Sequence, residues 1–425
     1  MGFNLAFHKN NKPIDYNILT VIELTDLVKV VEVAPEVFWV GVNDWNRRVF
    51  DSFIPLPYGT SYNAYLIVGN EHTALVDTVN PGFEDLLLRK VSRVVKPETI
   101  DYVVMNHAEP DHAGGIPRVL ATAQNAKLVA TRRGIEMAGV YYGVPPERAV
   151  AVKDGDSIDL GGKTLRFLEA PWLHWPETMF TLQAERQVLL TCDFFGTHMA
   201  SDRLFAEDVG DGLLKEAKKY YAEIMMPFTL FVQRALDKVA GLDVKVIAPS
   251  HGPIYRDPKR IIAAYEEWAR GPLKPKVVIA YVSMWGNTEA LTQAIVEAVA
   301  AEGVEAIPYN MVVADVAHVA SDLVDAAAVL FGSPTLIGGP HPLIASLLEV
   351  LRCIRPRVKL GAVYGSYGWG GGAAAHLKNR LQSMGFEVMG TLEVRGKPGK
   401  EDLEKAAGLA QAVARKVKES VIKIK

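Results

Sequence analysis

The chain has 425 residues, of which 49% are hydrophobic, and a formal net charge of −3. This length predicts two or three domains with sizeable cores, and the charge balance excludes a general nucleic-acid or membrane-surface binder. The two cysteines, Cys192 and Cys353, exclude a disulfide framework and C-x-x-C metal sites. With neither a signal peptide nor a membrane-spanning run expected, the predicted location is the cytoplasm.

Short apolar segments bounded by turn residues run from about Val28 to Thr191. They predict strands at 36–42, 64–69, 73–79, 101–107, 163–170 and 187–193, with a later strand that ends just before His251. Helical patterns fall at 83–95, 135–142, 213–240 and 258–270. This mixture of strands and interspersed helices predicts a layered α/β or α+β domain.

The pattern becomes regular after Gly271, where prolines at 272 and 275 mark a boundary. Strands are predicted at 276–283, 304–310, 327–333, 358–366 and 387–394, with helices between them and a last helix at 403–418. Five strands separated by helices predict a parallel, doubly wound sheet. We therefore expect one domain over 1–271, including an extension of unassigned function at 1–27, and a second domain over 272–425.

Groups that bind metals gather where the predicted strands of the first domain end. The strand at 101–107 runs into "HAEPDH", which contains His107, Glu109, Asp111 and His112. Other strand ends are followed by His174, Asp193 and His251. A single histidine after a strand usually has a structural role. Four strand ends with the same chemistry predict a metal site, because such ends converge at one edge of a sheet.

The number of candidate ligands predicts more than one metal ion. Seven groups exceed the three or four that one tetrahedral ion uses. Asp193 is the candidate for a bridge, because its two oxygens can each bind one ion. Cys192 is expected to point to the opposite face of its strand, so the set lacks a thiolate. Imidazole with several carboxylates favours iron or manganese, and zinc stays compatible with the same ligands.

A phosphate site is predicted at the start of the second domain. The strand at 276–283 leads into "SMWGNTEAL", which opens a helix and supplies Ser283, Met284, Trp285, Gly286, Asn287 and Thr288. Hydroxyls and free amides at a helix N-terminus bind phosphate. This segment resembles the flavodoxin phosphate loop, [ST]-x-T-x-N-T, from which Trp285 departs at the third position. The absence of G-x-G-x-x-G after the strand favours FMN over NAD.

The flavodoxin resemblance implies two further loops beside the flavin ring. One would be formed by Ser333, Pro334, Thr335 and Leu336, and the other by Gly365, Ser366, Tyr367, Gly368, Trp369 and Gly370. Tyr367 or Trp369 would lie against the ring, and the less favoured alternative for either aromatic side chain is ordinary surface packing.

The variant H-x-E-x-D-H at 107–112, followed by "HWPETMF", resembles the flavodiiron proteins, also called A-type flavoproteins. The resemblance covers about Val33 to the C-terminus. It implies a metallo-β-lactamase-like αββα sandwich followed by a flavodoxin-like domain. It also implies a catalytic di-iron centre in which His107, Glu109 and His174 hold one iron, Asp111, His112 and His251 hold the other, and Asp193 bridges. Related proteins differ in whether the histidine at the position of His112 coordinates.

The resemblance further implies a terminal oxidoreductase that reduces O2 to water, NO to N2O, or both. Electrons would come from an external donor, either rubredoxin, a separate flavin reductase or reduced F420, and would pass through FMN to the irons. A head-to-tail homodimer, or a dimer of dimers, is expected to bring the FMN of one chain beside the irons of another. His198, five positions after Asp193, is a candidate proton relay or a structural histidine.

Two other functions fit parts of the pattern. One is a dinuclear zinc hydrolase of the metallo-β-lactamase fold with the second domain as a scaffold, against which Glu109 and the phosphate loop both argue. The other is a non-catalytic FMN electron carrier or redox sensor with a structural metal site.

Overall fold

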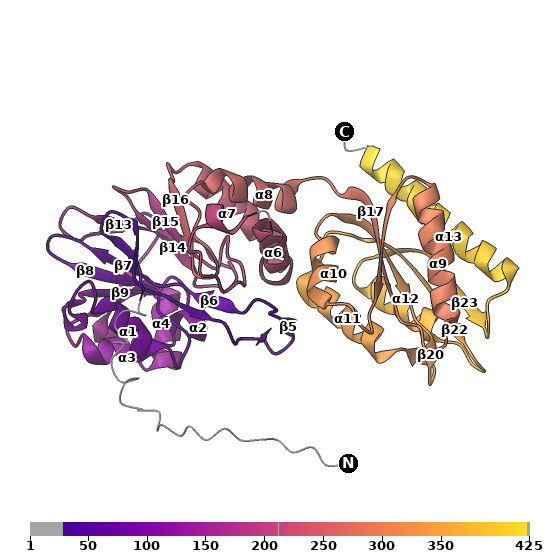
Figure 1. The fold of residues 1–425 in the computed structure, drawn as a ribbon, viewed down its shortest axis with the longest axis horizontal. Helices are drawn as coiled ribbons and strands as arrows, with labels where there is room; N and C mark the ends of the chain where they lie inside the picture. Colours follow the sequence, from indigo (N-terminus) through magenta and orange to yellow (C-terminus); the bar gives the residue numbers. More distant parts are fainter. Residues whose placement is uncertain (1–28, 211, 423–425) are drawn as a thin grey trace, which may run out of the picture.

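A computed structural model describes residues 29–210 and 212–422; the extension at 1–27 lies outside the described residues. Figure 1 shows two units side by side along the long axis, one coloured indigo to magenta and the other orange to yellow. The first unit contains two facing sheets with helices outside, and the second contains one sheet. The expected αββα sandwich and doubly wound sheet are confirmed.

The first sheet of the sandwich has seven strands in the order β1-β2-β7-β8-β9-β10-β11. Its strands are β1 Val31–Ala34, β2 Val37–Trp39, β7 Tyr65–Val68, β8 Thr73–Val76, β9 Tyr102–Val104, β10 Lys127–Thr131 and β11 Ala149–Val152. Strands β8 to β11 run parallel, so their carboxyl ends share one edge. The predicted strand at 73–79 ends at Val76, because Asp77 has a left-handed backbone with φ 56°.

The second sheet has five strands in the order β12-β13-β14-β15-β16. They are β12 Ser157–Asp159, β13 Thr164–Glu169, β14 Met179–Gln183, β15 Val188–Cys192 and β16 Val246–Pro249. Two short ribbons extend from the sandwich, one made of β3 Val42–Asp44 and β6 Thr60–Tyr62, the other of β4 Val49–Phe50 and β5 Ile54–Pro55.

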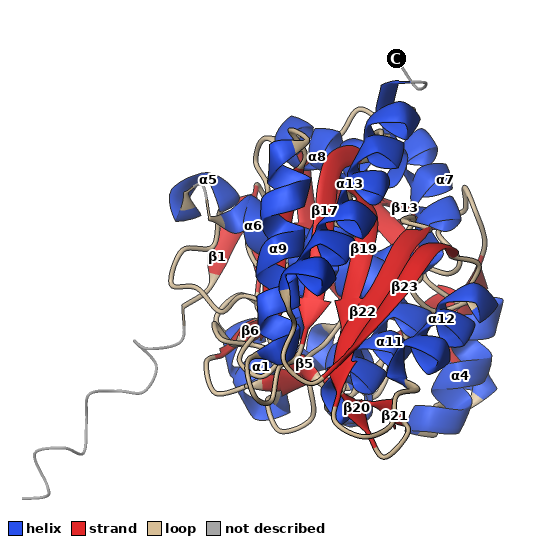
Figure 2. Ribbon diagram, turned by 90° about the vertical axis from the view of Figure 1, so that its right-hand side faces the viewer, coloured by secondary structure: helices blue, strands red, loops and turns tan. Residues whose placement is uncertain are grey.

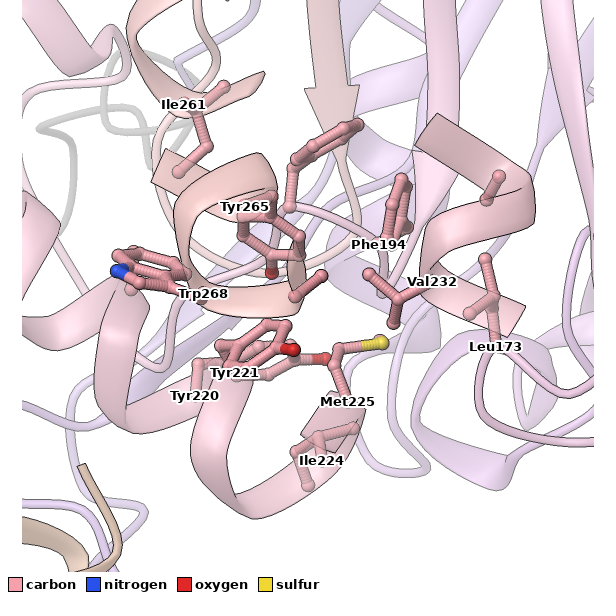
Figure 3. Packing of buried hydrophobic residues seen from close by; sticks show 14 of the residues in the cluster. Leu173, Phe194, Tyr220, Tyr221, Ile224, Met225, Val232, Ile261, Tyr265 and Trp268 are labelled. Atoms are coloured by element: carbon pink, nitrogen blue, oxygen red, sulfur yellow. The ribbon is translucent and has the colours of Figure 1, made fainter. Parts of the chain in front are cut away.

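Apolar side chains fill three layers of the sandwich. One core lies between the sheets, and a second lies between the first sheet and its helices, which are α1 Glu84–Val91, α3 Ile116–Thr122 and α4 Arg132–Tyr142, with the short α2 Pro110–Ala113 beside them. The third core lies beneath α6 Leu213–Tyr220, α7 Thr229–Ala240 and α8 Pro258–Arg270, and the short α5 Ala206–Val209 precedes them. Figure 3 shows this third core, where Tyr221 and Met225 lie beside Tyr265.

The helical region predicted at 213–240 is confirmed, and the structure divides it into several helical pieces. The chain forms α6, then a π-helical turn at Tyr221–Met225 and a 3₁₀ turn at Met226–Phe228, and then α7. Pro227 explains the break, because proline lacks the N–H that an uninterrupted helix needs. The π turn places Tyr220 and Glu223 close to the border with the second unit.

The second unit is a parallel sheet in the order β18-β17-β19-β22-β23, with helices on both faces (Figure 2). The strands are β17 Lys274–Tyr281, β18 Glu305–Asn310, β19 Ala326–Gly332, β22 Leu360–Tyr367 and β23 Glu387–Arg395. A small ribbon joins β20 Thr335–Leu336 to β21 Gly339–Pro340. The helices are α9 Asn287–Ala301, α10 Val316–Leu323, α11 Pro342–Ile354, α12 Ala373–Ser383 and α13 Lys400–Ile422. None of the described helices combines the length and apolar character that a bilayer crossing requires.

Apolar packing and ion pairs join the two units. Val324 and Ile354 of the second unit belong to the same buried core as the tyrosines of Figure 3. Beside this core, Asp325 contacts Lys218 of α6 at 3.0 Å and Lys276 of β17 at 2.5 Å.

Candidate functional site

The carboxyl ends of five strands deliver polar side chains to one end of the sandwich. Strand β9 leads into the loop with His107 and Glu109 and then into α2, which carries Asp111 and His112. Strands β13, β15 and β16 are followed by His174, Asp193 and His251. Strand β8 is followed by Asp77. Because these strand ends point to the same side, all seven predicted metal ligands come together.

Four of these side chains form one group. Ligand atoms of His107, Glu109, His174 and Asp193 all lie within 4.8 Å of one another. An oxygen of Glu109 is 3.2 Å from Nε2 of His107 and 3.0 Å from Nε2 of His174.

Three others, Asp111, His112 and His251, form a second group with the same spacing limit. Asp193 connects the two groups. Its Oδ2 is 3.5 Å from Nε2 of both His107 and His174, while its Oδ1 is 3.0 Å from Nε2 of His112 and 3.4 Å from Nε2 of His251. Each oxygen of one carboxylate therefore faces a different pair of imidazoles.

These separations suit a pair of metal ions. Two ligand atoms that are each about 2.1 Å from a shared ion lie roughly 3.0 to 3.5 Å apart. Several atoms of the set are buried yet lack a well-aligned hydrogen-bond partner, namely both carboxylate oxygens of Asp111, both ring nitrogens of His112 and Oδ2 of Asp193. Buried polar atoms are normally satisfied, so this concentration of lone pairs indicates a donor set that suits metal cations.

Outer hydrogen bonds fix the orientation of two imidazoles. Nδ1 of His107 lies 2.7 Å from Oε1 of Glu177, and Nδ1 of His251 lies 2.6 Å from the backbone oxygen of Ser61. In each ring the proton resides on Nδ1 when the imidazole is neutral, which leaves Nε2 free as a metal ligand. Glu177 and Ser61 were missed by the sequence analysis, because no spacing rule links them to the histidines before the fold is known.

Mutual interactions shift the ionisation of the cluster strongly. Burial alone would raise the pKa of Glu109, but hydrogen bonds from His107 and His174 hold it well below its usual range. Burial would lower the pKa of His107, but Glu109 and Glu177 raise it to about 10. In the same way, against burial, nearby carboxylates raise the pKa of His112 to about 9 and that of His174 to about 10. The negative potential that retains these protons also attracts metal cations.

Cys192 departs from its predicted orientation. Its Sγ lies within 4.8 Å of ligand atoms of His112 and Asp193. The expectation that it points away is wrong, because its φ of 49° interrupts the alternation of side chains along a regular strand. Burial raises the pKa of this thiol well above its ordinary value, which favours the thiol over a metal-binding thiolate.

Two residues from other elements surround the cluster. The hydroxyl of Tyr220 donates to Oδ1 of Asp193 at 2.9 Å. Asp51, in the turn between β4 and β5, has its pKa raised by burial and by the negative charge of Glu109, which places it near the cluster.

His198 lies beside His251, with ring centroids 4.8 Å apart. Thr60 connects the two rings, since its Oγ1 is 3.1 Å from Nδ1 of His198 and 3.2 Å from Nδ1 of His251. The predicted proximity of His198 to the site is therefore observed in the structure.

Three loops of the second unit leave the carboxyl ends of β17, β19 and β22. The predicted FMN contacts at 283–288 and 333–336 follow β17 and β19, and those at 365–370 span the last residues of β22 and the loop after it. The sheet order reverses at β17, and ligands of such folds bind beside this switch point. Hydrogen bonds connect these segments. Oγ1 of Thr288 is 3.0 Å from Oγ of Ser366, and the backbone N–H of Ser333 donates to the backbone oxygen of Tyr364 at 3.0 Å.

The shape of these loops fits a flavin phosphate and a flat ring. Gly286, with φ 82°, precedes the 15-residue helix α9 and leaves its first amides open toward the loop. No atom lies within 4 Å of the Cβ positions of Gly286, Gly368 and Gly370. Trp285 and Trp369 are 85% and 93% exposed, which leaves large aromatic faces uncovered at this end of the sheet.

Comparisons with known proteins agree with both domains. Residues 60–252 match the family described as ODP family beta lactamase, and residues 279–409 match the flavodoxin family. A nitric oxide reductase of Moorella thermoacetica is 40% identical over 394 residues, which cover 91% of this chain and 98% of the relative. A structure of the flavodiiron protein from Giardia intestinalis aligns over 93% of this chain and 98% of that chain, with TM-score 0.87 and 29% identity.

This chain belongs to the flavodiiron protein family. A coenzyme F420H2 oxidase of Methanocaldococcus jannaschii is 34% identical over 92% of this chain and 98% of the relative. The structure of rubredoxin oxygen:oxidoreductase from Desulfovibrio gigas aligns with TM-score 0.89 and 32% identity over 92% of this chain and 99% of that chain. These names favour an oxidoreductase over the hydrolase and over the non-catalytic carrier.

Proposed function

We propose that this flavodiiron protein is a terminal oxidoreductase that uses electrons from an external donor to reduce O2 to water, NO to N2O, or both. The observation that carries this proposal is the division of the Asp193 carboxylate between two imidazole pairs, in a chain that also presents three flavodoxin loops. Relatives with similarity over nearly the whole chain are named for these reductions.

The seven clustered side chains fit two iron ions. His107, Glu109 and His174 would hold one, Asp111, His112 and His251 the other, and Asp193 would bridge. The loops at 283–288, 333–336 and 365–370 would hold FMN. When bound, the irons supply Lewis acidity and electrons to a small diatomic gas, and FMN supplies electrons one or two at a time.

The protein's own residues orient this site and limit water. Glu177 and Ser61 fix the rings of His107 and His251, so that both Nε2 atoms point inward. The Trp175 ring packs edge-on against His107 at 5.0 Å, and Phe50 lies edge-on to His251 at 6.1 Å. These aromatic walls favour an uncharged diatomic substrate over a hydrated polar one.

The organisation of the chain follows from the same proposal. We place the domain boundary near Gly271, between the end of α8 at Arg270 and the start of β17 at Lys274. A head-to-tail homodimer would bring the FMN of one protomer to the irons of its partner. The exposed Trp285 and Trp369 beside the flavin loops offer an apolar surface for such contact.

The electron donor is proposed to be rubredoxin, a flavin reductase or reduced F420. Two of these possibilities agree with the names of relatives, a coenzyme F420H2 oxidase and a rubredoxin oxygen:oxidoreductase. A reducing compartment such as the cytoplasm suits the free thiols of Cys192 and Cys353.

The test is anaerobic turnover of iron- and FMN-loaded protein with reduced rubredoxin and its reductase, in which O2 and NO consumption are followed separately. Rapid consumption of either gas supports the proposal and identifies the preferred substrate. The same assay with chemically reduced protein removes the dependence on the donor. If that protein, with its metal and flavin content verified, consumes neither gas, the proposed function is wrong.

A further inference from the structure

Asn63, the residue directly after strand β6, is buried and uses both ends of its side-chain amide in hydrogen bonds. Its Nδ2 donates to the backbone oxygens of Pro249 and Gly252, both at 2.8 Å. Its Oδ1 accepts from the indole Nε1–H of Trp39 at 2.9 Å. These partners determine the orientation of the amide, because an indole N–H can only donate and the two carbonyls can only accept.

The two carbonyls belong to the turn that carries His251. This turn follows strand β16, and its residues Pro249 and Gly252 lie on opposite sides of the histidine. The backbone N–H of Asn63 also donates to the backbone oxygen of Ser250 at 2.7 Å. Asn63 therefore binds every residue of the turn 249–252 except His251 itself.

Ser61, two residues before Asn63, adds two contacts to the same turn. Its Oγ accepts from the backbone N–H of Gly252 at 2.7 Å, and its backbone oxygen lies 2.6 Å from Nδ1 of His251. A Cβ at Gly252 would lie 2.5 Å from the backbone oxygen of Thr197, so the turn is closely packed on its other side as well. In this position Nε2 of His251 lies 3.2 Å from Oδ2 of Asp111.

The two groups of metal ligands differ in how their imidazoles are supported. In the first group, the carboxylate of Glu177 supports His107. In the second group, Nδ1 of His112 is buried and has no hydrogen-bond partner among the described residues. The second group therefore relies on His251 for an imidazole of fixed orientation, and that orientation depends on the turn that Asn63 holds.

We propose that Asn63 is a positioning residue for the second metal position. Its amide holds the turn 249–252 so that Nε2 of His251 points at the ion that Asp111 and His112 also hold. The inference rests on the proposed function, because it takes the pair of metal positions from it. The hydrogen bonds of the amide go to Trp39 and to backbone oxygens, so Asn63 acts on the ion through His251.

Replacement of Asn63 by Asp tests this role with almost no change in side-chain volume. A carboxylate has no N–H, so the oxygens of Pro249 and Gly252 lose their donor and face a negative charge instead. The repulsion is expected to displace the turn and to move Nε2 of His251 away from the ion. Ser61→Ala removes one contact of the same turn without burying a charge, so it carries the test if Asn63→Asp does not fold.

Asn43→Asp is the matched control. Asn43 lies in β3, and its Nδ2 also donates to a backbone oxygen, that of Ser201, at 2.8 Å. This contact has the same chemistry but holds no turn that carries a metal ligand. Asn43→Asp therefore reports the general cost of losing an amide-to-carbonyl hydrogen bond beside the site.

Two measurements on full-length protein separate positioning from general damage. The first is stepwise removal of the two irons from iron- and FMN-loaded protein by a coloured chelator, which gives an affinity for each position. The second is nuclear magnetic resonance of histidine ring protons with diamagnetic zinc in place of iron. The Nδ1 protons of His107 and His251 are each held in a short hydrogen bond, so both are expected to exchange slowly and to resonate at low field. Loss of a signal in His251→Ala assigns that signal to His251.

We expect Asn63→Asp to weaken one iron by about 10- to 100-fold and to leave the affinity of the other as in wild type. The His251 signal is lost or shifted, and the His107 signal stays. Ser61→Ala shows the same pattern to a smaller extent, and Asn43→Asp behaves as wild type in both measurements.

Three results would contradict parts of this account. Wild-type affinities and a wild-type His251 signal in folded Asn63→Asp and Ser61→Ala overturn the inference and leave the proposed function intact. Equal weakening of both irons, with both histidine signals changed, also overturns the inference, because it assigns the effect to general damage. A wild type that binds no pair of metal ions overturns the proposed function itself.

Discussion

Nδ1 of His107 and Oε1 of Glu177 lie 2.7 Å apart, although 70 residues separate them in the chain. Glu177 is also anchored by the backbone N–H of Ala108 at 2.8 Å. Its carboxylate therefore holds the ring of His107 and the loop that carries Glu109 in one arrangement. An outer carboxylate of this kind raises the basicity of a metal-binding imidazole and fixes its tautomer.

Replacement of Glu177 by Gln is expected to weaken iron binding by about 10- to 100-fold, because an amide lacks the negative charge that raises the basicity of the His107 imidazole. Competition with a coloured chelator measures this affinity. Glu169→Gln, on the exposed end of β13, is the matched control and is expected to bind iron as wild type does. Equal affinities for Glu177→Gln and wild type would show that His107 needs no support from this carboxylate.

Much of the fold follows from the sequence, because strand ends and helix starts carry local signals. Two short patterns predict a ligand site from neighbouring residues alone: "HAEPDH" after an apolar strand and "SMWGNTEAL" before a helix. The supporting contacts carry no such signal. Glu177, Ser61 and Tyr220 reach the cluster only through tertiary packing.

The helical region at 213–240 was predicted as a whole, and its division into α6, the two turns and α7 was not predicted, although Pro227 gives a local reason for part of it. Apolar periodicity at 213–240 continues through the proline, and the π turn packs against α10 of the second domain, a contact that the sequence alone does not reveal. The predicted orientation of Cys192 was wrong for a related reason. One residue with a left-handed backbone at the end of a strand reverses the direction of its side chain, and the sequence around a single cysteine does not reveal such a backbone.

Replacement of Asp193 by Asn is expected to remove at least one of the two irons. The amide keeps one oxygen and replaces the other by an NH2 group, which cannot bind a cation. One of the two imidazole pairs then faces a donor in place of an acceptor. Elemental analysis of purified protein measures the loss, with the exposed Asp202→Asn as control. Full iron occupancy in Asp193→Asn would contradict a bridging role for this carboxylate.

Acid is expected to weaken the junction between the domains through Asp325. Burial would raise the pKa of this carboxyl, but the ammonium groups of Lys276 and Lys218 lower it from 3.8 to about 2. Since the folded pKa lies below the unfolded one, the pair stabilises the protein fully above about pH 4, and this stabilisation is lost as pH falls toward 2. Its size is about 2 kcal/mol.

Asp325→Asn tests this expectation by urea unfolding at several pH values. Its free energy of unfolding is expected to lie below that of wild type at pH 7, and the difference is expected to shrink as pH falls below about 4. The exposed pair of Glu349 and Arg352 provides the control, because Glu349→Gln is expected to change stability by less than about 1 kcal/mol at any pH. If the difference in free energy of unfolding between Asp325→Asn and wild type stays constant with pH, the effect of the substitution comes from packing and not from the charge of Asp325.

Two glycines, Gly365 at the end of β22 and Gly368 in the loop after it, allow the FMN site to be tested separately from stability. A Cβ at Gly365 would lie 1.8 Å from the backbone oxygen of Ser333, whereas a Cβ at Gly368 would meet no atom within 4 Å. Gly365→Ala is therefore expected to lower the free energy of unfolding by about 1 to 3 kcal/mol and to displace both loops. Gly368→Ala is expected to leave the stability of the flavin-free protein unchanged.

Flavin binding separates the two variants further. Gly365→Ala is expected to weaken FMN binding at least about tenfold, because the loops that hold the ring have moved. If the ring covers Gly368, Gly368→Ala also weakens binding without loss of stability, since the added methyl group then occupies space that the ring needs. Quenching of FMN fluorescence gives the affinity, and Gly408→Ala in α13, which also meets no atom within 4 Å, is the control. Wild-type affinity in both loop variants would place the flavin elsewhere on this sheet.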